Sequence, residues 1–111
     1  MLTDSEFKAA VELALDTLNR AMDTVADEHD VEILYQSGVL SIEIEDPAPS
    51  KIVISPNSSA GQIWISAQWT SFKLDWSEPL ESFVYRPTGE TIQTLVGRLT
   101  GEELGISPLT F

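Results

Sequence analysis

The chain has 111 residues, about the length of one domain, and its 42% apolar and 22% charged residues are typical of a globular protein. Eighteen acidic against six basic residues give a net charge of −12, which excludes nucleic-acid binding by phosphate neutralisation and disfavours docking to an anionic membrane. Without cysteine and with one histidine, the chain cannot form a disulfide framework or a multi-histidine zinc site, so any metal must be held by oxygen.

No targeting or membrane-spanning segment is recognisable. No stretch approaches the roughly 20 apolar residues of a membrane span. Residues 1–6 lack the basic and apolar regions of a signal peptide. We therefore expect a cytoplasmic, monomeric protein with a single domain over residues 1–111.

The N-terminal segment has the pattern of a long amphipathic helix. Thr3 and Glu6 form a capping box, in which each side chain bonds to the other residue's backbone. Apolar residues follow at spacings of three and four from Phe7 to Val25, which places them on one helical face. This predicts a helix over about 4–26 whose apolar stripe faces the core.

Most of the excess negative charge lies in the first half of the chain. Residues 1–50 contain twelve acidic and two basic residues, a net charge of −10. At 100° per residue, four carboxylates of the predicted helix lie within about 60° of one another, on the face away from the core: Glu12, Asp16, Asp23 and Asp27. Asn19 and Arg20 interrupt this stripe.

The acidic run continues past the helix through Glu28, Asp30 and Glu32. Acidic side chains near a helix C-terminus oppose the helix dipole, and such a local conflict is expected at functional sites. The alternative is a solvated acidic face that keeps the protein soluble.

The middle of the chain, about 31–85, has the pattern of short strands joined by turns. Alternating apolar and polar residues predict strands at 31–35, 39–45, 51–55, 62–67, 72–76 and 83–85. A second helix is predicted over about 91–100, followed by a coil tail over 101–111. The predicted fold class is therefore α+β: a two-layer sandwich with both helices on one face of a five- to six-stranded, mainly antiparallel sheet.

Trp64 is predicted to point away from the helices. In the strand 62–67, Ile63 and Ile65 face inward, so Gln62, Trp64 and Ser66 share the opposite face. An exposed tryptophan is typical of a protein interface. The alternative is a tryptophan covered by a loop, beside Trp69 or Tyr85.

Several short motifs together resemble the frataxin/CyaY family. They are Ser5-Glu6-Phe7, Val31-Glu32-Ile33, Ser37-Gly38-Val39-Leu40-Ser41, Gln62-Ile63-Trp64-Ile65-Ser66, Asp75-Trp76 and the helix start Gly89-Glu90-Thr91-Ile92 with Leu95. They occur in the family's order over about residues 4–100. The resemblance implies a helix–sheet–helix sandwich.

The resemblance also implies weak, exchangeable binding of Fe(II) or Fe(III) on an acidic ridge, and partnership with the cysteine desulfurase and scaffold protein of iron–sulfur cluster assembly. The ridge positions that carry family-like acids are Asp4, Glu12, Asp16, Asp23, Glu28, Asp30 and Glu32. Helix geometry adds Asp27. Trp64 occupies the sheet position that family members use for partners, with Gln62 and Ser66 beside it.

This chain departs from the family pattern at four positions. Asn19 and Arg20 replace acids in the middle of the ridge. Ser55 stands where an asparagine usually follows the third strand, and Lys8 stands where a histidine often lies.

Carboxylates suit the implied chemistry because iron accepts oxygen ligands. Side chains at i and i+4 of a helix can share one ion, so Glu12/Asp16 and Asp23/Asp27 are candidate pairs, although they are exposed and not preorganised. We predict an iron-binding accessory protein that docks on the desulfurase–scaffold complex and supplies iron or regulates its rate. The alternative is a metal-independent acidic module, an adaptor or inhibitor of a basic partner.

We do not expect an enzyme. The sequence has no recognisable buried carboxylate pair or histidine ligand set, so no catalytic residues are predicted. Ferroxidase activity is implied by the family resemblance alone.

Overall fold

The computed structural model describes residues 2–45, 48–67 and 69–110, and in this part of the chain seven strands lie between two helices. Helix α1 spans Asp4–Glu28 and α2 spans Ile92–Leu104. The strands are β1 Val31–Gln36, β2 Val39–Ile44, β3 Ser50–Asn57, β4 Gln62–Ala67, β5 Thr70–Ser77, β6 Ser82–Tyr85 and β7 Glu90–Thr91. Each strand pairs antiparallel with its neighbours in the sequence, in the order β1 to β7.

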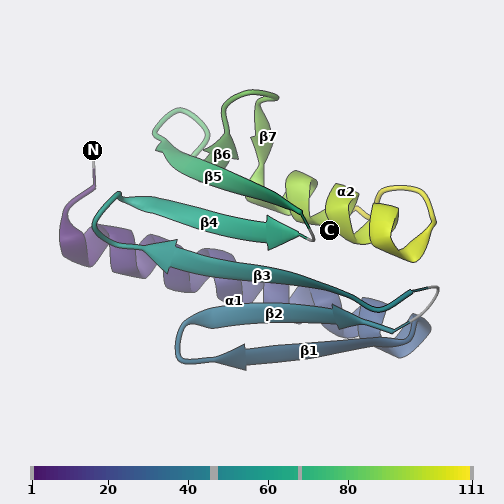
Figure 1. Ribbon diagram of the computed structural model, residues 1–111. Helices are drawn as coiled ribbons and strands as arrows, with labels where there is room; N and C mark the ends of the chain where they lie inside the picture. The colour runs from purple at the N-terminus through teal and green to yellow at the C-terminus, as the bar shows by residue number, and fades with distance from the viewer. Residues whose placement is uncertain (1, 46–47, 68, 111) are drawn as a thin grey trace.

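The predicted two-layer α+β sandwich is confirmed. Figure 1 shows both helices on the same side of the sheet, with α1 against β1 and β2 and α2 against β6 and β7. The core lies between the layers, where the apolar stripe of α1 meets the inward residues of the strands, among them Leu40, Ile54 and Leu74. The other face of the sheet, which we call the open face, is covered by neither helix of the described residues.

Helix α1 begins as the sequence predicts. The Thr3 hydroxyl accepts a hydrogen bond from the Glu6 N–H (3.2 Å), and the Glu6 carboxylate accepts one from the Thr3 N–H (2.9 Å). The bond from the Thr3 N–H to the carboxylate is the main cause that holds the pKa of Glu6 below its usual value. The helix continues two residues beyond the predicted end, to Glu28, where the His29 N–H bonds to the Val25 carbonyl (2.9 Å).

The C-terminal part differs from the prediction in two ways. The pair Glu90–Thr91 forms a seventh strand with β6, and Thr91 then caps α2. Residues 101–104, predicted as coil, are helical, so this part of the prediction was wrong. The physical reason is packing, because Gly101 and Leu104 are buried and Gly105 ends the helix with φ 72°. Of the predicted loop and tail, residues 46, 47 and 111 lie outside the described residues.

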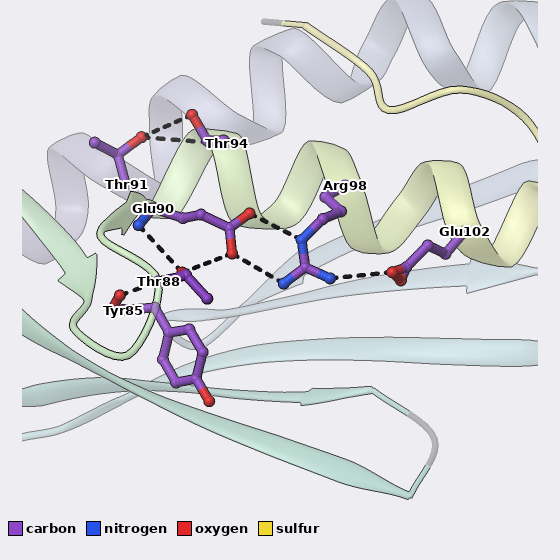
Figure 2. Close-up of polar contacts among 7 residues, drawn as sticks. All are labelled: Tyr85, Thr88, Glu90, Thr91, Thr94, Arg98 and Glu102. Atoms are coloured by element: carbon purple, nitrogen blue, oxygen red, sulfur yellow. Dashed lines mark hydrogen bonds and ion pairs between the residues drawn. The ribbon is translucent and has the colours of Figure 1, made fainter.

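An arginine cluster ties β7 to α2 (Figure 2). Arg98 donates two hydrogen bonds to the Glu90 carboxylate (2.8 and 2.9 Å) and one to Glu102 (3.0 Å). The Thr88 hydroxyl donates a further bond to Glu90 (2.7 Å). The bonds from Arg98 are the main cause that lowers the pKa of Glu90, and Glu90 in turn raises the pKa of Arg98.

Candidate acidic ridge and sheet face

The four carboxylates of the predicted helical stripe are all exposed on α1, opposite its buried face. The stripe consists of two i,i+4 pairs, Glu12/Asp16 and Asp23/Asp27. From the helical rise, members of a pair are about 6 Å apart along the axis and the two pairs are about 10 Å apart. Asp4 lies about 12 Å before Glu12 on the same scale. The stripe is therefore long and open.

Tyr35 on β1 shows which strand the stripe faces. Burial of its ring, a hydrogen bond with the Asp16 carboxylate and the charges of Asp16 and Glu12 together raise the pKa of Tyr35. The stripe thus borders β1, where Glu32 is exposed on the strand and Asp30 is exposed just before it. With Asp4 and Glu28, the predicted set forms what we call the acidic ridge: Asp4, Glu12, Asp16, Asp23, Asp27, Glu28, Asp30 and Glu32.

The charge of the acidic ridge is not compensated locally. Among residues 2–45, 48–67 and 69–110, no ridge carboxylate forms an ion pair with a lysine, arginine or histidine. Arg20 lies four residues after Asp16 and three before Asp23, yet it is exposed and bonds to neither. Asp27 and Glu28 also lie in the last turn of α1, which contains no basic residue. The ridge is therefore an arrangement that costs stability.

The ridge contains no preformed chelate. In the part of the chain that the structure describes, no three histidine or acidic side chains converge closely enough to hold a metal ion. A cation on the ridge would contact one or two carboxylates and keep much of its water. The geometry fits transient contact with cations or with basic side chains, and not tight chelation.

Glu43 is a further acidic residue that sequence reasoning did not assign to the ridge. In the β1–β2 ladder it lies directly opposite Glu32. Glu45 follows at the end of β2, where its N–H bonds to the Asp30 carbonyl (3.3 Å). The alternation of β2 places Glu43 and Glu45 on the polar face, but only the strand register brings Glu43 beside Glu32. The negative surface thus continues onto the open face.

We expect Glu32→Gln to stabilise the fold by about 0.5 kcal/mol, because like charges directly opposite in a ladder repel, and Glu32 on the edge strand β1 has Glu43 as its cross-strand neighbour. Glu43 is not the residue to change, because it also lies opposite Lys51 on β3. Urea denaturation at low ionic strength measures the gain, which should shrink in about 0.5 M salt as the charges are screened. Glu32→Asp, which keeps the charge, is the control and should show no gain. A loss of stability in Glu32→Gln would contradict a repulsive pair.

The predicted sheet-face residues are held by a chain of polar contacts. Trp64 is 38% exposed, and its indole N–H donates to the Gln62 side-chain oxygen (2.9 Å). The Gln62 amide donates to Asp75 (2.9 Å), which also pairs with Arg86 (3.4 Å). The Lys73 ammonium lies 5.0 Å from the centre of the Trp64 ring. These contacts fix the orientation of the indole on the open face.

The structure places Gln62, Trp64 and Ser66 together on the open face, with Ser55 opposite Trp64 on β3. Neither Trp69 nor Tyr85 covers Trp64: Trp69 is 96% exposed, and Tyr85 packs edge-on against Phe72. Strands β2 and β3 separate this surface from the ridge strand β1. The molecule therefore presents two distinct surfaces.

No helix of the described residues is both long and apolar enough to cross a membrane.

A sequence model described as a frataxin-like domain matches residues 1–106. The chain is 32% identical to the iron–sulfur cluster assembly protein CyaY of Dechloromonas aromatica over an alignment of 109 residues, which covers 93% of this chain and 97% of the relative. It is 24% identical to the CyaY protein of Azotobacter vinelandii over 106 residues, covering 94% and 91% of the two chains.

The fold resembles the solved structure of frataxin from Psychromonas ingrahamii, with a TM-score of 0.81 over 96% of each chain. At 15% sequence identity this likeness concerns the fold alone. The match of the family model to nearly the whole chain agrees with the helix–sheet–helix architecture described above. The chain belongs to the frataxin-like family.

Proposed function

We propose that this protein is a non-catalytic accessory factor of iron–sulfur cluster assembly that holds iron weakly on the acidic ridge and docks on the cysteine desulfurase–scaffold complex. The relatives named as iron–sulfur cluster assembly proteins support the pathway. The single observation that carries the proposal is the ridge of exposed carboxylates without ion pairs among the described residues.

The charge distribution supports two uses of the same ridge. An exposed row of carboxylates attracts Fe(II) or Fe(III), which accept oxygen ligands. The same row attracts a basic protein surface, because complementary charges raise association rates and fix orientation. Iron on the ridge would reduce its negative charge, and so iron loading would weaken docking. This coupling gives a simple way for iron to regulate the complex.

A second candidate is a metal-independent acidic module that docks on a basic partner as an adaptor or inhibitor. The observation that favours it is the lack of three converging ligands among the described residues. The two candidates share the partner and differ in whether iron binds saturably.

The double variant Glu12→Gln/Asp16→Asn should bind the cysteine desulfurase about tenfold more weakly than the wild type, because it removes one pair of the stripe. Affinity is measured by calorimetry at fixed ionic strength. Anaerobic titration with Fe(II), followed by amide resonances of α1, should show reduced shifts in the same variant.

The control is Glu81→Gln/Glu102→Gln, which removes the same charge away from the ridge and should leave both titrations unchanged. Trp64→Ala should retain the Fe(II) response while it weakens binding of the scaffold. Loss of desulfurase binding without any saturable Fe(II) response in the wild type would support the metal-independent module. Unchanged desulfurase binding in the ridge variant would contradict both candidates.

A further inference from the structure

Trp69 is the most exposed large apolar side chain among the described residues. It lies in the short connection between the end of β4 at Ala67 and the start of β5 at Thr70 and is 96% exposed. An indole carries a large apolar surface, and a tryptophan left in water is typical of the residues that anchor protein interfaces. Within the described residues, Trp69 takes part in no ring contact and does not belong to the core cluster.

Trp69 borders an open cleft of about 420 Å³ at the end of the sheet. Its lining residues come from β3, β4 and the segments beside them: Pro49, Ser50, Lys51, Val53, Ser66 and Trp69. Val53 and Ser66 are cross-strand partners and both lie on the open face. We call this hollow the Trp69 cleft. Its walls are an indole, a proline and a valine, which suit an apolar side chain.

The polar side chains that face the Trp69 cleft are hydrogen-bond donors, and one of them is positively charged. Lys51 is exposed, and no ion pair is formed by it within the described residues, although Glu43 lies opposite it in the ladder. The Ser66 hydroxyl is exposed on the open face, whereas Ser50 lies opposite the buried Ile44, so its buried hydroxyl is on the core side of the sheet. Lys51 and Ser66 can both donate hydrogen bonds to a carboxylate. The cleft therefore offers donors and a positive charge, in contrast to the acidic ridge.

The cleft is continuous with the Trp64 surface along β4. Ser66 lies two residues from Trp64 on the same face, and Lys73 lies opposite Trp64 in the β4–β5 ladder. One path over the central strands is thus bordered by two tryptophans and two lysines: Trp64, Trp69, Lys51 and Lys73. An extended segment along this path meets apolar contacts in the middle and ammonium groups at the sides.

We propose that the Trp69 cleft binds an extended protein segment that carries an apolar side chain flanked by carboxylates. The apolar side chain lies against Trp69, Pro49 and Val53, and a carboxylate accepts hydrogen bonds from Lys51 and Ser66. This inference deepens the proposed function, since it assigns the chemistry of the partner on the open face. That partner is acidic, whereas the partner on the ridge is basic.

Selection from a random dodecapeptide library on phage tests the proposal directly. The full chain is the bait, and Trp69→Ala is used for counter-selection. We expect a shared sequence with an apolar residue between aspartates or glutamates. A synthetic peptide of that sequence should shift the Trp69 indole resonance and change tryptophan fluorescence saturably.

Matched variants then test whether the peptide binds in the Trp69 cleft. Trp69→Ala should weaken peptide binding about tenfold, and Lys51→Ala should weaken it about threefold. Leu80→Ala removes another exposed apolar side chain, 57% exposed in the β5–β6 connection, and should have no effect. Circular dichroism checks that each variant is folded, which is expected because all three side chains are exposed.

The proposal fails if the library gives no shared sequence, or if the shared sequence is basic. It also fails if the selected peptides bind Trp69→Ala as well as the wild type, or if light scattering shows that this protein forms dimers that depend on Trp69. A fluorescence blue shift with phosphatidylglycerol vesicles but not with the peptide would assign the tryptophan to a lipid surface instead. Because the library does not involve the desulfurase or iron, failure here leaves the ridge titrations unaffected, and the reverse also holds.

Discussion

An Arg98→Met variant should lose about 2 kcal/mol of its free energy of unfolding, because it leaves the Glu90 carboxylate mostly buried without its main partner. The Glu90 side chain is only 15% exposed, and Arg98 supplies two of its hydrogen bonds. Methionine retains the aliphatic packing of the arginine and removes only its charge and donors. Urea denaturation at pH 7 measures the loss.

Glu102→Gln is the matched control for this prediction. It removes the second ion pair of Arg98, but the Glu102 side chain is 55% exposed, and exposed pairs contribute about 0.5 kcal/mol. The two variants should therefore differ clearly. Equal losses would mean that the cluster acts through surface charge and not through the mostly buried Glu90.

The pH dependence of stability gives a second measurement on the same pair. Hydrogen bonds from Arg98 hold the pKa of Glu90 below 4.5 in the folded protein. Such a group stabilises the fold above its unfolded pKa, and this contribution disappears as the pH falls through the folded value. The wild type should therefore lose stability below about pH 4.5 more steeply than Arg98→Met.

The fold was predictable wherever local patterns decide the structure. The capping box and the spacing of apolar residues from Phe7 to Val25 predict α1 because capping and burial act along one segment. The end of α2 was missed because Gly97 and Gly101 weaken a helix when judged by local propensity. Tertiary packing overrides that propensity here, since both glycines are buried. The strand β7 was missed because two residues of ladder pairing leave no periodic pattern.

The candidate surfaces were predictable to a similar extent. The helical stripe follows from residue spacing alone. The position of Glu43 beside Glu32 depends on strand register, and the contact from Gln62 to Asp75 joins residues thirteen positions apart. The exposure of Trp69 depends on what the rest of the fold leaves uncovered. Local sequence carries none of this information, because each of these relations is set by the assembled sheet.

Gly101→Ala should destabilise the protein by about 2 kcal/mol, although alanine normally favours a helix over glycine by about 1 kcal/mol. A Cβ atom at position 101 would lie 2.7 Å from the Ser107 carbonyl oxygen and 3.0 Å from the Pro108 Cα. Both are backbone atoms of the C-terminal tail, which folds back over α2. The tail is held there by the Ile106 N–H bonded to Gly101 (2.9 Å) and the Leu109 N–H bonded to Gly97 (3.1 Å).

The same substitution in a chain that ends at Gly105 separates the two effects. Without residues 106–111 the clash is absent, so the alanine should stabilise the shortened protein by about 0.5–1 kcal/mol. A change of sign between the two backgrounds, measured by thermal and urea unfolding, would show that the tail imposes glycine on the helix. If alanine destabilises both backgrounds equally, the strain lies within α2 or its contact with the sheet. If it stabilises both, the tail yields easily and contributes little to the fold.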